Sequence, residues 1–216
     1  MAGVQDLRIG YDTVSATTSI PIAPMNESPS EGNKKALLDD IYQVASFGGT
    51  PLRQTLARAG KTFECSSGNY CPILPAPEGT CQRNYALLFS DGYWNGGAGE
   101  PGNTDIDGPG AFDGGRYADN VNATLADTAM HYYETDLWPT LADRVPVSAR
   151  DIAGAPPGTF NSVAPVMHQH MQTYAIGFGV QGTIDPGTRV FVKPKGGMMA
   201  GLDVSGQQIN FTPSAG

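Results

Sequence analysis

Two short stretches of this 216-residue sequence combine an oxygen-bearing side chain with turn residues in a way that suits a divalent cation. Thr50 follows two glycines and precedes Pro51, and Asp91 ends an apolar run and is followed by a glycine. Hydroxyl and carboxylate oxygens are ligands that Mg²⁺ and Ca²⁺ accept, and such an ion can keep an open position for a partner's acidic group. Simpler interpretations also exist, because threonine is a good helix N-cap and Asp-Gly is a common turn.

The acidic loop that begins at Asn103 is a second candidate cation site. Oxygen side chains stand at every second position in Asn103, Asp105 and Asp107, and a glycine follows, as at the start of an EF-hand calcium loop. Gly114 occupies the twelfth position, where that loop has a glutamate, and Asp113 is the neighbouring substitute. The pattern predicts a Ca²⁺ loop, with a solvated acidic loop as the alternative.

The histidines allow an enzymatic alternative. Asp127 and His131 are four residues apart in an expected helix and share a face, and His168 and His170 flank a single residue. Together with Asp91 they would form the metal centre of a hydrolase. Such an Asp–His pair is more often a surface contact, and a histidine before a buried strand often fills a polar niche. No G-x-S-x-G motif occurs, so we favour a non-enzymatic function and keep the metal-dependent hydrolase as the alternative.

Three cysteines, Cys65, Cys71 and Cys81, lie in one loop rich in Pro, Ser and Gly. In an oxidising compartment the simplest interpretation is one disulfide and one free thiol, with the pairing open; inert thiols are the alternative. A zinc site would need a fourth ligand, and no histidine is near in sequence.

Trp94 follows Asp91 closely in the sequence. An exposed aromatic beside a binding loop can anchor a partner. The alternative is that Trp94 packs the long loop that follows onto the domain.

Apolar periodicity predicts alternating strands and helices, with a loop over 15–32. Strands are expected at 7–14, 84–92, 173–180 and 189–192, and helices at 34–47, 51–63 and 121–136. Asn33 is expected to cap the first helix, and the apolar residues of the first two helices are expected to form buried stripes. The second and third strands are apolar without alternation, so both faces are expected to be buried. This order predicts an α/β fold with a doubly wound, mainly parallel sheet, flanking helices and long loops. Ligands of such sheets bind at the carboxyl ends of the strands, where Thr50 and Asp91 would meet.

Composition excludes some functions. The formal charge of −8 argues against a nucleic-acid partner and permits cation binding. No apolar run approaches the roughly 20 residues that span a bilayer. No signal peptide is visible either, and we expect an export signal outside this sequence.

The Thr50 and Asp91 motifs resemble two parts of the metal-ion-dependent adhesion site of von Willebrand factor A domains. That family's remaining ligands come from D-x-S-x-S after its first strand, and this sequence lacks that motif; 203–207 has Gln where the second Ser belongs. The strand expected at 7–14 resembles the family's second strand. We therefore expect residues 1–182 to form a partial domain that lacks the first strand, and 183–216 to be an extension or the start of a following region.

A longer resemblance, over roughly 45–182, is to PilY-like proteins of the type IV pilus tip. Its most specific motifs are Asp91-Gly92-Tyr93-Trp94-Asn95 and Gln169-His170-Met171. The resemblance implies an exported protein at the cell surface, pilus tip or outer membrane, with roles in adhesion, pilus biogenesis and twitching motility. It implies minor pilins, a host or abiotic surface, and a following domain as partners, and Mg²⁺ or Ca²⁺ as the ion.

Overall fold

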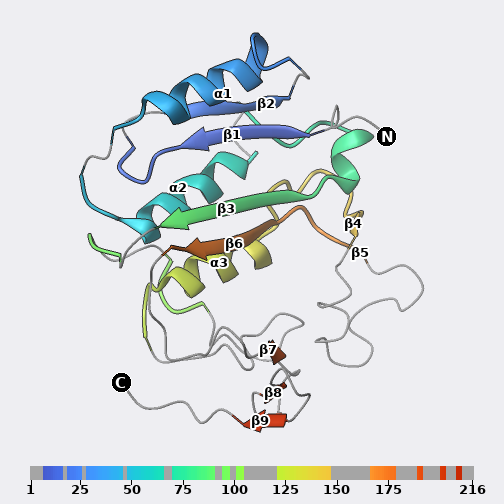
Figure 1. The fold of residues 1–216 in the computed structure, drawn as a ribbon. Coiled ribbons are helices and arrows are strands. Elements are labelled where there is room, and N and C mark those ends of the chain that lie inside the picture. Colours follow the sequence, from blue (N-terminus) through green and yellow to red (C-terminus); the bar gives the residue numbers. More distant parts are fainter. Residues whose placement is uncertain are drawn as a thin grey trace.

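The computed structural model describes residues 7–16, 19–25, 28–45, 48–65, 70–90, 94–97, 101–104, 121–146 and 166–178, and strand positions 189–191, 200–202 and 208–210. The described chain is mixed α/β, which confirms the coarse fold class (Figure 1). The sheet topology agrees only in part with the prediction. One strand pair is parallel, and the other described pairs are antiparallel.

The parallel pair consists of β3 (Asn84–Ser90) and β6 (Met171–Gly177). Their register pairs Asn84 with Met171 and Ser90 with Gly177, so both carboxyl ends meet at one rim. Both strands were expected, although each begins or ends two or three residues away from the predicted bounds. A parallel pair requires a crossover connection, and the chain between β3 and β6 contains the helix α3 (Leu125–Glu134).

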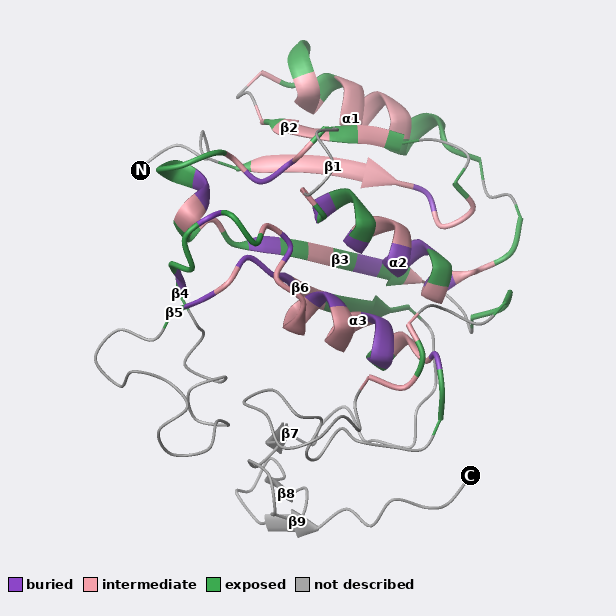
Figure 2. Cartoon of the chain, turned by 180° about the vertical axis from the view of Figure 1, so that it is seen from behind, coloured by how far each residue is buried: buried purple, intermediate pink, exposed green. Residues whose placement is uncertain are grey.

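Helices α2 (Leu52–Phe63) and α3 pack against each other and against one face of β3 and β6, as the view from behind shows (Figure 2). The apolar stripe of α2 was predicted from its spacing, and Leu56 and Phe63 are buried in the core cluster. Gly60 lets the two helices approach, because a Cβ there would collide with the Tyr132 ring. The core therefore lies between these helices and the inner face of the parallel pair.

The outer face of the parallel pair is exposed among the described residues, so the prediction of burial on both faces is wrong. Every second residue of each strand lies on this outer face. The apolar ones are Tyr85, Leu87, Phe89, Tyr174 and Ile176, with Phe178 just beyond β6. Tyr85 contacts Tyr174, and Phe89 stacks on Phe178 with ring centroids 6.1 Å apart. Aromatic contacts therefore link the two strands on this exposed face.

The first two strands form an antiparallel pair, β1 (Arg8–Asp12) with β2 (Ser19–Pro24). The predicted loop over 15–32 is therefore wrong for β2, whose two prolines had argued against a strand. Pro21 is exposed and Pro24 is the last residue of the strand. Proline is tolerated at such positions of an edge strand, where its missing N–H costs no ladder bond.

Helix α1 (Gly32–Gln43) packs on β1 and β2, but its predicted buried stripe and asparagine cap are both wrong. None of its residues is buried, and the N-cap is Glu31. Asn33 instead donates hydrogen bonds to the main-chain oxygens of Ile9 and Ala23, which ties the helix to both strands.

On β1, burial and then the charges of Asp40 and Asp12 raise the pKa of Tyr11.

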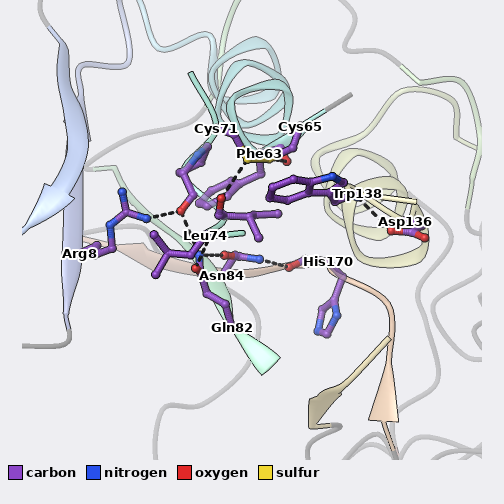
Figure 3. The surroundings of a disulfide bond; sticks show 12 residues. Arg8, Phe63, Cys65, Cys71, Leu74, Gln82, Asn84, Asp136, Trp138 and His170 are labelled. Atoms are coloured by element: carbon purple, nitrogen blue, oxygen red, sulfur yellow. Dashed lines mark hydrogen bonds between the residues drawn. A yellow bond between two sulfur atoms is a disulfide. The ribbon is translucent and has the colours of Figure 1, made fainter. Parts of the chain in front are cut away.

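At the amino ends of β3 and β6 a disulfide joins Cys65 to Cys71 (Figure 3). Cys81 is an exposed free thiol. Near the disulfide, the Gln82 side chain accepts from the Leu74 N–H and donates to the Asn84 side chain. Asn84 in turn donates to the His170 main-chain oxygen. These bonds hold the cysteine loop against the parallel pair at the end opposite the candidate site.

Three further antiparallel elements are short. β4 (Val145–Pro146) pairs with β5 (Val166–Met167). In the tail, β7 (Arg189–Phe191), β8 (Ala200–Leu202) and β9 (Gln208–Asn210) form a three-stranded sheet, of which only β7 was expected. The proposed boundary between 1–182 and 183–216 stays a prediction.

Candidate functional site

The start of α2 and the segment after β3 are joined at the carboxyl rim of the parallel pair. In Figure 1, α2 begins beside the arrowhead of β3. The Asn95 side-chain oxygen accepts the Thr50 N–H at 2.8 Å, and the Asn95 N–H donates to the Thr50 main-chain oxygen at 2.9 Å. A Cβ at Gly49 would collide with the same Asn95 oxygen, so a side chain there would displace the Asn95 side chain. Thr50 is thus brought to the rim by two reciprocal bonds.

Thr50 is not the cap of α2, so this simpler interpretation of its hydroxyl is wrong. The N-cap is Pro51, and the helix begins at Leu52. The Thr50 main chain instead accepts from both Leu52 and Asn95. Its side chain is half-buried at the rim.

Arg53, in the first turn of α2, connects three segments around the same rim. Its Nη1 donates to the Ala123 main-chain oxygen and its Nη2 to that of Gly97, each at 2.9 Å. The guanidinium carbon lies 3.7 Å from the centre of the Trp94 ring, a cation–π contact. Trp94 is 52% exposed, and most of the long loop that follows it lies outside the described residues, so whether Trp94 packs that loop onto the domain stays a prediction.

Asp127 is fully buried and organises the start of α3. Its carboxylate accepts from the Thr124 N–H and hydroxyl, and Thr124 caps the helix in return, which completes a capping box. Its other oxygen accepts the Thr104 N–H at 2.9 Å. Asp127 therefore anchors the beginning of the candidate calcium loop, next to Asn103. Because Asp127 is buried, the interpretation of Asp127 and His131 as a surface pair is wrong.

The histidines have separate surroundings. His170 is buried, with Nδ1 placed 2.8 Å from the His168 main-chain oxygen and its ring edge-on to Tyr133. His131 packs edge-on against Tyr132 on α3. Over the described residues, no three His, Cys, Asp or Glu side chains are grouped to hold a metal ion. This arrangement gives the hydrolase alternative no support, with Asp91 outside the described residues.

Several predicted ligands lie outside the described residues, namely Asp91, Asp105, Asp107 and Asp113. The predicted meeting of Thr50 with Asp91 therefore stays a prediction. Sequence reasoning named Asn95 only as part of the PilY-like motif 91–95 and assigned no positioning role to Asn95 or Arg53. The signal for Asn95 was the turn composition Asn95-Gly96-Gly97, and Gly96 indeed has a positive φ of 102°.

Comparison with curated proteins identifies relatives among the type IV pilus biogenesis factors, which confirms the predicted resemblance. PilY1 of Pseudomonas aeruginosa strain PAO1 is 35% identical over 154 residues, which is 65% of this chain and 13% of that protein. PilY1 of strain UCBPP-PA14 is 30% identical over 141 residues, or 62% of this chain and 12% of the relative. The aligned segment is thus a small part of each relative.

No family model and no solved structure matches the chain. The von Willebrand factor A assignment accordingly stays a prediction. In the part of the chain that the structure describes, no helix is long and apolar enough to cross a membrane.

Proposed function

We propose that this chain is an adhesion or assembly module of the type IV pilus system, and that it binds a partner through a cation site at the carboxyl rim of β3 and β6. The observation that carries the proposal is the pair of hydrogen bonds between Thr50 and Asn95. They hold the Thr50 main chain against Asn95, which lies shortly after the end of β3 at Ser90; Asp91 directly follows Ser90 in the sequence. The 35% identity to a type IV pilus biogenesis factor supports the biological setting.

The proposed ion is Mg²⁺ or Ca²⁺, with Thr50 and Asp91 as two of its ligands. Water and a partner's carboxylate would complete the oxygen shell that these hard ions require. An ion would also reduce electrostatic repulsion. A chain with a formal net charge of −8 repels an acidic partner unless a cation bridges the two.

We propose export to the cell surface, pilus tip or outer membrane as the location, with minor pilins, a host or abiotic surface, or a following domain as the partner. The disulfide between Cys65 and Cys71 supports export, because such bonds persist in oxidising compartments and are rare in the cytosol.

The ion is tested with two matched substitutions. Thr50→Val keeps the size of the side chain and removes its oxygen, whereas Thr50→Ser keeps the oxygen. We expect Mg²⁺ to raise the melting temperature of the wild type and of Thr50→Ser but not of Thr50→Val, since an ion at about 100 times its Kd adds roughly 2.7 kcal/mol of stability. Equal stabilisation of all three proteins, or of none, would contradict the Thr50 site.

The biological function is tested in cells that carry the natural gene with Asp91→Ala. Loss of surface attachment with normal numbers of pili, counted by electron microscopy, would indicate adhesion. Loss of the pili themselves would indicate assembly. Normal attachment, piliation and twitching would contradict the proposal.

We also propose that Asn103, Asp105, Asp107 and Asp113 form a separate Ca²⁺ loop. The bond from the Thr104 N–H to buried Asp127 supports this, because it fixes the start of the loop to α3. In the Thr50→Val background, calorimetry should detect Ca²⁺ binding that a further Asp105→Ala and Asp107→Ala change abolishes. No Ca²⁺ binding in Thr50→Val would rule the loop site out.

A further inference from the structure

Trp94 is an exposed aromatic side chain that the rim holds in a fixed place. The Arg53 guanidinium covers one face of the indole at 3.7 Å, while the residue as a whole stays 52% exposed. Two hydrogen bonds fix the Arg53 guanidinium to the main chains of Gly97 and Ala123. The guanidinium therefore restricts the movement of the indole that it contacts. An aromatic group that is already immobilised loses little conformational entropy when a partner packs on it.

The segment that carries Trp94 is also fixed relative to Thr50, the described ligand of the proposed ion site. The next residue, Asn95, makes both reciprocal bonds with Thr50. After it, Gly96 has a φ of 102° and leaves its hypothetical Cβ only 3.1 Å from Pro51. The segment 94–97 therefore follows the start of α2 closely, and Trp94 is the sequence neighbour of the residue that bonds to Thr50.

The guanidinium of Arg53 is engaged in contacts within the rim. Its Nη1 and Nη2 donors point at main-chain oxygens, and its flat face meets the indole. It is therefore not oriented to form the two parallel bonds with which arginine recognises a carboxylate. An acidic group of the partner would be bound by the ion, and the indole would be available for an apolar neighbour of that group.

We propose that Trp94 is a partner-contact residue of this rim, with Arg53 and Asn95 as its positioning residues. The partner is a protein segment in which an acidic residue adjoins an apolar side chain: the acid reaches the ion and the apolar group packs on the indole. The inference rests on the proposed ion site. Aromatic anchors of this kind are typical centres of binding energy in protein interfaces.

Two capped dipeptides serve as probes. N-acetyl-Asp-Phe-amide carries the acid and an apolar neighbour, and N-acetyl-Asp-Gly-amide carries the acid alone. In saturating Mg²⁺ we expect the Phe peptide to bind about tenfold tighter, the effect of burying part of one apolar side chain. Trp94→Ala should remove that preference and leave the affinity for the Gly peptide unchanged, whereas Trp94→Phe should keep part of it.

Fluorescence supplies a second measurement. The sequence contains two tryptophans, so Trp138→Phe leaves Trp94 as the sole indole reporter. Binding of the Phe peptide should change its emission, and the Gly peptide should change it less. Arg53→Lys, which removes the planar fork, should reduce the preference between the peptides when each variant is measured at its own saturating Mg²⁺ concentration. Arg58→Lys is the control on the same helix, because Arg58 pairs with Asp12 instead.

The outcomes separate the two proposals. If Mg²⁺ does not bind, the ion site fails and the contact role of Trp94 fails with it. If Mg²⁺ binds but both peptides bind Trp94→Ala and the wild type with the same ratio, only the role of Trp94 is overturned. A monosaccharide that changes Trp94 emission when neither peptide does would overturn that role as well.

Discussion

At the scale of single residues, the rim depends on side chains that bond to the main chain of distant segments. Asn95 bonds to Thr50, Arg53 to Gly97 and Ala123, and Asp127 to Thr104. Loops cannot satisfy their N–H and C=O groups through a ladder, so such bonds fix their course. These residues therefore determine the shape of the site without being proposed ligands themselves.

Asp127 allows the most direct test of this arrangement. Asp127→Ala should lower the free energy of unfolding by about 2–4 kcal/mol, because it removes the capping box and leaves two N–H groups without their acceptor. Urea unfolding followed by circular dichroism measures the loss. Asp143→Ala, at an exposed position, should change it by less than about 0.5 kcal/mol. Similar losses in both variants would show that Asp127 is not the anchor.

At the scale of elements, the contact between α2 and α3 depends on a glycine. In the middle of an exposed helix, Gly→Ala usually stabilises by about 0.5–1 kcal/mol. At Gly60 the new methyl would meet the Tyr132 ring, so Gly60→Ala should instead destabilise by about 1–3 kcal/mol.

The Gly60 prediction has an internal control. Tyr132→Leu makes room for the methyl group, so Gly60→Ala should cost less in that background than in the wild type. The coupling is read from the unfolding free energies of the two single variants and the double variant. Additive losses would show that the helices do not meet at Gly60.

Local sequence patterns predicted some of these elements and missed others. α2 was predicted almost to its ends because Leu52, Leu56 and Phe63 recur on one helical face and a proline precedes them. β2 was missed because Pro21 and Pro24 outweigh the alternation of Ile20 and Ile22 in a reading by local propensity. This stretch is a strand because it pairs with β1, and the propensities of its own residues do not record that pairing.

The candidate site was predictable to a smaller extent. Thr50 was identified from its motif, yet the residue that positions it, Asn95, is 45 residues away in the sequence. Local patterns carry no information on such a pairing. The apolar run of β3 likewise indicates a buried strand, but it does not state whether a second layer covers the outer face.

At the scale of the whole molecule, two strand pairs share one supporting helix. Arg58 of α2 pairs with Asp12 at 2.6 Å and bonds to Thr13, and Thr55 bonds to Val14. α2 also contacts β3. In the described parts of the chain, β1 and β3 belong to different sheets, so this helix, rather than a continuous ladder, joins the pairs.

The outer face of β3 and β6 then determines how the molecule behaves in solution. Its aromatic and aliphatic side chains are 41–55% exposed and adjoin one another along both strands. Contiguous apolar surface of this kind promotes association and binds hydrophobic dyes. We expect the wild type to bind bis-ANS while folded and to associate as its concentration rises.

Two neighbouring leucines test this description. Leu87 is 55% exposed on the outer face, and Leu88 is 9% exposed on the inner one. Leu87→Lys should reduce dye binding and association while changing the unfolding free energy by about 1 kcal/mol or less. Leu88→Lys places a charge in the core, so it should cost more than about 3 kcal/mol or prevent folding. Light scattering, dye fluorescence and urea unfolding measure the difference. If Leu87→Lys were as damaging as Leu88→Lys, the outer face would have to be packed against another layer, and a sheet covered on one side only would be wrong.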